Sequence, residues 1–158
     1  MAKKKEEKTN VMRLLDQKKI PYVPHTYPHG GDGAPDGVSV ANSLGIDPAA
    51  VFKTLVTRGA SKTCHVFVIP VLAELDLRRA ASVSGNKKLE MIHVKELLPL
   101  TGYMRGGCSP IGMKKKYPTY IDETYILFDE IAVSAGMRGE QIILDPNDLV
   151  RYVGAEVY

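Results

Sequence analysis

A lysine inside an apolar run is the residue of this 158-residue sequence whose setting suggests chemistry most directly. Lys53 lies in residues 51–57 (VFKTLVT), whose composition predicts a β-strand. Strand alternation puts Lys53 on the same side as Val51 and Leu55. It is either a solvent-exposed lysine on a two-faced strand or an ammonium that the backbone holds against a phosphate or a developing oxyanion. Both interpretations stay open at this point.

A glycine-rich segment, residues 102–112 (GYMRGGCSPIG), is the second candidate site. The consecutive Gly106 and Gly107 let backbone N–H groups approach a ligand closely and form an anion-accepting nest. Lysines follow at 114–116, and no acid occurs between Arg105 and Asp122, which suits a phosphate-bearing partner. The simpler alternative is a surface loop with solvated charges. The segment has neither the Walker A nor the Rossmann glycine pattern.

A shorter glycine segment, residues 134–139 (SAGMRG), lies between two predicted strands. One interpretation is a hairpin turn with no further role. The other is that Ser134 and its neighbours offer hydrogen bonds to a small polar ligand. The sequence favours neither interpretation, so the segment is kept as a candidate part of the site while the simple hairpin turn stays an equal alternative.

Neither cysteine has the neighbours of a nucleophile or a metal ligand. Cys64 adjoins His65 on a predicted strand, so these two side chains point to opposite faces. Cys108 would need one of the four histidines as a base, and the sequence places none of them for that role. No Cys/His spacing typical of a zinc site occurs. We predict that Cys108 packs as a small thiol and that the protein uses neither a metal nor a cofactor.

Composition and charge exclude several classes of protein. Hydrophobic residues make up 44% of the chain, which excludes disorder, and no apolar run approaches the ~20 residues of a membrane span. The net charge of +3 divides unevenly, because residues 1–19 are basic whereas residues 120–148 carry seven acids against Arg138 alone. A net charge as small as +3 disfavours a protein that coats DNA non-specifically. Without a disulfide framework or an apolar stretch after the basic N-terminus, we expect a cytoplasmic protein.

The elements that position these residues follow from periodicity and turn signals. Helices are predicted at residues 9–19, 38–44, 73–82, 94–98 and 145–153, the first capped by Thr9 or Asn10 and the last by Asp145. Strands are predicted at residues 51–57, 63–69, 117–121, 124–128, 130–134 and 140–144, with residues 21–28 as an edge strand. Residues 1–8 are expected to form a flexible tail and residues 28–37 a binding loop. The sequence predicts one α/β domain of the α+β type, residues 1–158, with a mixed or antiparallel sheet.

Four segments resemble the YbaK proteins, which are free-standing relatives of the editing domain inserted in bacterial prolyl-tRNA synthetases. They occur in the family's order at residues 21–27 (PYVPHTY), 51–56 (VFKTLV), 101–112 (TGYMRGGCSPIG) and 133–139 (VSAGMRG). The resemblance runs from about residue 9 to the end. It implies a mixed, barrel-like β-sheet flanked by helices.

The resemblance also implies an activity, the clearance of cysteine from mischarged Cys-tRNA(Pro) and from Cys-tRNA(Cys). Lys53 matches the family lysine that is thought to hold the 3′ end of the tRNA. The residues implied to bind the substrate are Tyr27, Thr54, Gly106, Gly107, Ser109 and Ser134. In the family mechanism the substrate thiol attacks its own ester carbonyl and releases a cyclic thiolactone, a reaction of lyase type. The implied partners are the acceptor end of tRNA(Pro) and, in addition, prolyl-tRNA synthetase, with no role for DNA or a membrane.

Two alternatives and one departure accompany this resemblance. An alanine-specific deacylase and a non-catalytic module that binds aminoacyl-tRNA or a nucleotide would show the same segments. Gln141 stands where the best-known family members carry an acid shortly after the Gly-x-Arg-Gly turn. The residues around 141 therefore cannot be assumed to perform the family's acid chemistry.

Overall fold

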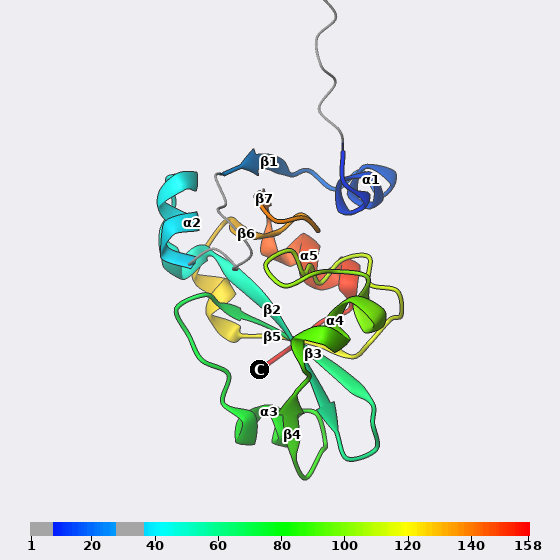
Figure 1. Ribbon diagram of the computed structural model, residues 1–158. Helices are drawn as coiled ribbons and strands as arrows, with labels where there is room; N and C mark the ends of the chain where they lie inside the picture. The colour runs from blue at the N-terminus through cyan, green and yellow to red at the C-terminus, as the bar shows by residue number, and fades with distance from the viewer. Residues whose placement is uncertain (1–7, 28–36) are drawn as a thin grey trace, which may run out of the picture.

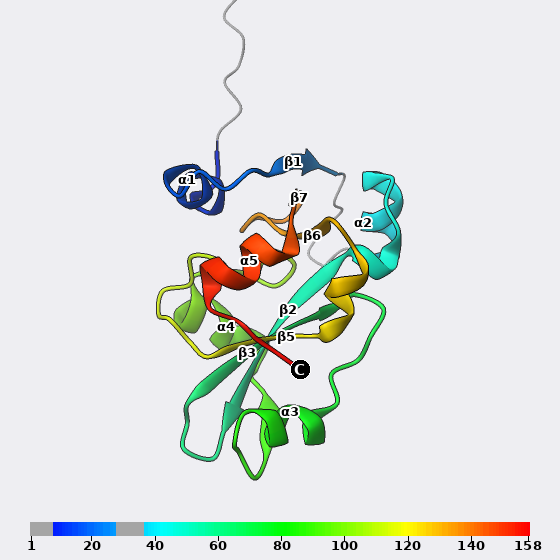
Figure 2. The same cartoon turned by 180° about the vertical axis from the view of Figure 1, so that it is seen from behind.

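Two β-sheets form the framework of the structure, a computed structural model that describes residues 8–27 and 37–158 (Figures 1 and 2). The smaller sheet has the order β1-β7-β6, with β1 (Val23–Thr26), β7 (Glu140–Leu144) and β6 (Ile131–Ser134). The larger sheet has the order β4-β2-β3-β5-β8, with β4 (Leu89–Met91), β2 (Phe52–Gly59), β3 (Cys64–Pro70), β5 (Thr119–Ile121) and β8 (Glu156–Val157). The expected tail (residues 1–8) and loop (residues 28–37) fall, but for their last residues, outside the described ranges.

The larger sheet is mixed, as the sequence predicts. β2 pairs antiparallel with β3 and β4, whereas β3 pairs parallel with β5 and β5 parallel with β8. The two sheets meet at an isolated parallel bridge between Val51 and Ala132. Within residues 8–27 and 37–158 the strands do not close into a barrel. Strands as short as β4, β5 and β8 cannot carry the continuous, staggered ladder that a closed barrel requires.

Short helices pack around the two sheets, as Figures 1 and 2 show from opposite sides. They are α1 (Asn10–Gln17), α2 (Gly37–Leu44), α3 (Leu77–Val83), α4 (Val94–Thr101) and α5 (Pro146–Val153), with a 3-10 turn η1 (Pro48–Ala50). The predicted caps of the first and last helices are confirmed: Thr9 Oγ1 accepts from Met12 N at 3.3 Å and Asp145 Oδ1 from Asn147 N at 2.9 Å. None of these described helices is long and apolar enough to cross a membrane.

The strand predicted at residues 124–128 is wrong, because this segment forms the 3-10 helix η2 (Glu123–Leu127). Asp122 Oδ1 accepts a hydrogen bond from Thr124 N at 2.9 Å, and this local cap prevails over the β propensity of the segment. The helix predicted from residue 73 begins only at Leu77, after Asp76 caps it. Strands β4 and β8 were not predicted, since three and two residues are too few to show a period.

Two separate apolar clusters pack at the start of β2. Phe52 packs in a cluster with Val11 of α1 and Ile142 of β7, whereas Val51 packs in a second cluster with Tyr27. The side chains of Phe52, the first residue of β2, and of Val51 just before it are at most 2% exposed. The neighbouring Lys53 and Thr54 are only half-buried, so the strand is firmly held at the point where it offers polar side chains to a cavity.

Candidate functional site

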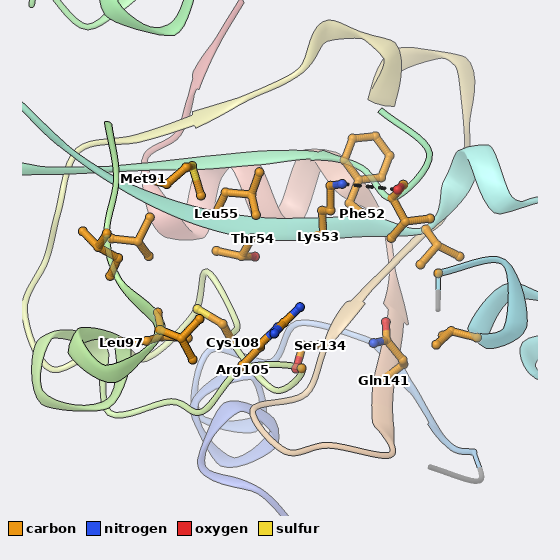
Figure 3. Close-up of a pocket in the computed structure, with 18 of the residues that line it drawn as sticks. Phe52, Lys53, Thr54, Leu55, Met91, Leu97, Arg105, Cys108, Ser134 and Gln141 are labelled. Carbon is orange, nitrogen blue, oxygen red and sulfur yellow. Dashed lines mark hydrogen bonds between the residues drawn. The ribbon is translucent and has the colours of Figure 1, made fainter. Parts of the chain in front are cut away.

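A cavity of about 440 Å³ gathers most of the residues singled out from the sequence. Figure 3 shows Lys53 and Thr54 on the β2 side, with Arg105, Ser134 and Gln141 across from them. Of the seven predicted site residues, those that line the cavity are Tyr27, Lys53, Thr54, Gly106 and Ser134. Gly107 and Ser109 are not among the lining residues. The strand lysine, the glycine loop and the serine turn therefore meet although they lie far apart in the sequence.

Lys53 carries a positive charge that no carboxylate neutralises within the described residues. Its Nζ donates a hydrogen bond to the carbonyl oxygen of Val71 at 3.3 Å (Figure 3). That carbonyl belongs to the segment directly after β3, and β3 lies opposite β2 with Ile69 facing Lys53 in the register. A single long hydrogen bond leaves the other two ammonium donors available, so the side chain can bind an anionic or oxygen-rich ligand in the cavity.

The wall across from Lys53 comes from the smaller sheet. Ser134 ends β6 and lies opposite Gln141 of β7 in the antiparallel register. Ser134 Oγ accepts a hydrogen bond from Gly136 N at 3.1 Å, so the serine both holds its turn and keeps its own O–H for a ligand. The segment is thus a structural turn that also lines the cavity. The two interpretations made from the sequence are compatible.

The glycine loop is fastened to the turn at residues 134–139. A Cβ on Gly107 would lie 3.0 Å from the backbone nitrogen of Arg138, so a larger residue would have to push the two segments slightly apart. Arg138 Nε donates to the carbonyl oxygen of Arg105 at 2.6 Å. Ser109 is fully buried, and its Oγ accepts from Ile111 N at 3.2 Å. Gly107 and Ser109 therefore shape the loop from behind the cavity wall.

The expected nest of backbone donors is present only in part. The N–H of Gly107 donates to the carbonyl oxygen of Met104 at 2.9 Å and is not available to a ligand. The N–H of Gly106 has no such partner within the described residues, and Gly106 lines the cavity with a φ of 87°. One free backbone donor at Gly106, with the exposed Arg105 beside it, remains for a developing negative charge.

Cys108 also lines the cavity, but its thiol is not activated. Burial raises the pKa of Cys108 to about 12, so the thiol stays protonated at neutral pH and is a weak nucleophile. The side chain packs against two of the apolar clusters, in agreement with the packing role predicted for it. Among the described residues no group of three or more His, Cys, Asp and Glu side chains could hold a metal ion.

The apolar end of the cavity was not predicted from the sequence. It is formed by side chains of β4, α4 and the segment between them: Met91, Ile92, Val94 and Leu97. Arg58 of β2 fixes α4 through a two-pronged ion pair with Glu96, with nitrogen–oxygen distances of 2.5 and 3.1 Å. The hydrogen bond from Arg58 lowers the pKa of Glu96 to about 2. Such side chains carry no chemical signature, and the helix predicted at residues 94–98 was the only signal near them.

Comparison with known families and proteins gives a consistent result. Residues 33–152 match the family described as the aminoacyl-tRNA editing domain. EbsC of Enterococcus faecalis, whose name gives it as a Cys-tRNA(Pro)/Cys-tRNA(Cys) deacylase, is 51% identical over 151 residues, covering 95% of this chain and 92% of its own. The multifunctional Ser/Thr-tRNA deacylase ProXp-y of Escherichia coli is 27% identical over 161 residues, covering 99% and 94%.

Solved structures share the fold at lower identity. A trans-editing enzyme for prolyl-tRNA synthetase superposes with a TM-score of 0.81 at 24% identity, covering 94% of this chain and 92% of the other. A hypothetical protein superposes with a TM-score of 0.83 at 19% identity, covering 93% and 95%. At these identities the agreement concerns the fold, which in this chain is an antiparallel sheet and a mixed sheet flanked by helices.

Proposed function

The chain belongs to the aminoacyl-tRNA editing domain family, and from this premise we propose that it deacylates mischarged aminoacyl-tRNA in trans, with Cys-tRNA(Pro) and Cys-tRNA(Cys) as its substrates. The observation that carries the proposal is the cavity. Lys53, whose ammonium bonds the Val71 carbonyl, lines this cavity together with Gly106 of the glycine loop, and the lining residues include no activated nucleophile. An aminoacyl ester is already activated, so its cleavage needs positioning and oxyanion stabilisation more than an enzyme nucleophile.

Each of the seven site residues singled out from the sequence has a role in this reaction. Lys53 holds the phosphate-rich 3′ end of the tRNA through charge-assisted hydrogen bonds. The free N–H of Gly106 donates to the ester carbonyl oxygen as negative charge develops on it. Tyr27, Thr54 and Ser134 enclose the aminoacyl group, while Gly107 and Ser109 support the loop that carries Gly106.

The substrate itself supplies the nucleophile. Its thiol sulfur forms a bond to the ester carbonyl carbon, and the bond from that carbon to the ribose 3′ oxygen breaks. The thiol proton ends on that oxygen, and the products are uncharged tRNA and a cyclic thiolactone, which makes the reaction lyase-like. This route separates cysteine from alanine by chemistry, which a small pocket cannot do strongly by size alone.

The substrate's charge explains the partners we assign. A net charge of +3 gives a weak hold on a whole tRNA, so the protein acts on the acceptor end with strong salt dependence. Docking on prolyl-tRNA synthetase would raise the effective concentration of that end without new contacts. We place this reaction in the cytoplasm, where mischarged tRNA is produced.

Incubation of the purified full chain with Cys-tRNA(Pro), Ala-tRNA(Pro) and Pro-tRNA(Pro) tests the proposal. We expect loss of the cysteinyl ester only, and mass spectrometry of the released product should find the thiolactone. Clearance of alanine but not of cysteine would move the protein to an alanine-specific group. Saturable binding of the acceptor end without ester loss would instead make it a binding module.

A further inference from the structure

Two buried polar atoms of the cavity have no hydrogen-bond partner within residues 8–27 and 37–158: Thr54 Oγ1 and Gln141 Oε1. Gln141 is 7% exposed, and it lies on β7 across the cavity from the β2 residues (Figure 3). Buried polar side-chain atoms nearly always have hydrogen-bond partners. An amide oxygen without one has lost its hydrogen bonds to water, and this desolvation destabilises the protein. Two such atoms lining one cavity indicate a ligand that supplies the missing partner.

The chemistry of the two side chains limits what that partner can be. An amide oxygen only accepts, so the ligand group at Gln141 must be a donor, and neither an ester carbonyl nor a phosphate oxygen qualifies. A cysteinyl ester offers donors in its α-amino group and in its thiol. The thiol is a weak donor and must stay free to react. The α-amino group remains, and its N–H donors match the acceptor that the Gln141 amide oxygen presents.

The charge of the cavity favours the same assignment. Its lining residues include Lys53 and Arg105 but no carboxylate among the residues that the structure describes. Positive neighbours favour the neutral form of an amine. A neutral amide accepts a hydrogen bond from an amine and from an ammonium alike, so Gln141 binds the group in either state. An acid at this position would bind mainly the charged form.

We propose that Gln141 is a specificity-determining residue that binds the α-amino group of the aminoacyl ester, so that the site selects esters with a free α-amino group. This inference rests on the proposed deacylase function, which it deepens. Ser134, opposite Gln141 in the strand register, keeps the β6–β7 end aligned.

The test compares two esters on the same tRNA(Pro): cysteinyl and 3-mercaptopropionyl, which keeps the thiol and lacks the amino group. We expect the wild-type protein to clear the cysteinyl ester with a kcat/KM about ten to a hundred times higher. In Gln141→Met, which keeps the size and loses the acceptor, that ratio should fall to about one. The fall should come from a higher KM for the cysteinyl ester. Gln141→Glu keeps an acceptor oxygen and should restore the ratio, with a new dependence on pH.

Gln17→Met, on the exposed face of α1, is the matched control and should leave the ratio unchanged. Equal slowing of both esters in Gln141→Met, or an unchanged ratio, would overturn the inference and leave the deacylase function standing. Clearance of neither ester by the wild type would instead refute the proposed function. In that case binding replaces turnover: the Kd values of non-cleavable 3′-amide analogues of the two acyl adenosines are compared in the wild type and in Gln141→Met. The ratio of these Kd values then decides the role of Gln141.

Discussion

The two ends of the cavity are built in different ways. The polar end places Thr54, Ser134 and Gln141 on strands, where backbone hydrogen bonds of two sheets fix each side chain. The apolar end takes Met91 from the three-residue edge strand β4, which pairs with β2, and Leu97 from the eight-residue helix α4, which the Arg58–Glu96 ion pair holds to β2. We conclude that the polar end is the rigid part that sets the chemistry. The apolar end determines how well the acyl group fits, and we expect it to tolerate substitution better than the polar end does.

The largest expected effect comes from Lys53→Ala, which removes the unneutralised charge at the polar end. We expect kcat/KM to fall at least about a hundredfold with the fold unchanged, because the charge-assisted hydrogen bond that holds the tRNA 3′ end is lost and the reacting ester is misplaced. Single-turnover clearance of Cys-tRNA(Pro) measures it, with the exposed Lys87→Ala as the matched control. Unchanged turnover in Lys53→Ala would reject the assigned role.

Gly107→Ala tests whether the polar end depends on the close approach of two loops. The added Cβ would lie 3.0–3.2 Å from the backbone at 137–138, so we expect a loss of about 1–3 kcal/mol in stability and about tenfold in kcat/KM. Thermal unfolding and the deacylation assay report the two effects. Gly85→Ala is the control, because no atom lies within 4 Å of its new Cβ; its positive φ, which Gly107 does not share, adds backbone strain without crowding a neighbour. If Gly85→Ala lowers activity as much, loop packing is not the cause.

Leu97→Ala tests the apolar end, and there we expect a smaller change. Truncating this half-buried side chain should raise KM about three- to tenfold and leave kcat nearly constant, since the reacting atoms lie at the polar end. Its neighbour Leu98, half-exposed and not part of the lining, gives the control Leu98→Ala. A fall in kcat for Leu97→Ala would contradict the division between the two ends.

The smallest effect concerns the ion pair that holds the apolar end. The pKa of Glu96 is lowered from 4.5 to about 2, chiefly by the hydrogen bond from Arg58. A lowered carboxyl pKa contributes stability that is complete above pH 4.5 and is lost as pH falls toward 2. Denaturant unfolding across this range should show a steeper acid loss in the wild type than in Glu96→Gln. Parallel curves would show that the pair contributes nothing to folding.

Much of the polar end could be predicted from the sequence, because its residues are chemically marked. A lysine in an apolar strand and paired glycines in a basic loop stand out, and Lys53 and Gly106 line the cavity. The sequence could not show that the N–H of Gly107 is already bonded, since that depends on the loop conformation. Gln141 was noticed only as a departure from a family pattern. Its buried, unpartnered oxygen becomes visible only when β6 and β7 are paired.

The fold was predictable where local signals were long or strong. The hairpin β2–β3 and the caps at Thr9 and Asp145 follow from patterning and capping chemistry. The strand predicted at residues 124–128 failed because the cap by Asp122 decides that segment locally. The parallel pairing of β3 with β5 joins residues some fifty positions apart, and no local pattern encodes such a contact.

The bridge between Val51 and Ala132 has a consequence for the geometry of the cavity. Lys53 and Thr54 belong to one sheet, Ser134 and Gln141 to the other, and the bridge is the backbone joint between the sheets within the described residues. A small rotation at this joint changes every distance across the cavity together, while each sheet keeps its own geometry. The spacing between Lys53 and Thr54 on one sheet and Ser134 and Gln141 on the other therefore depends on the angle between the two sheets.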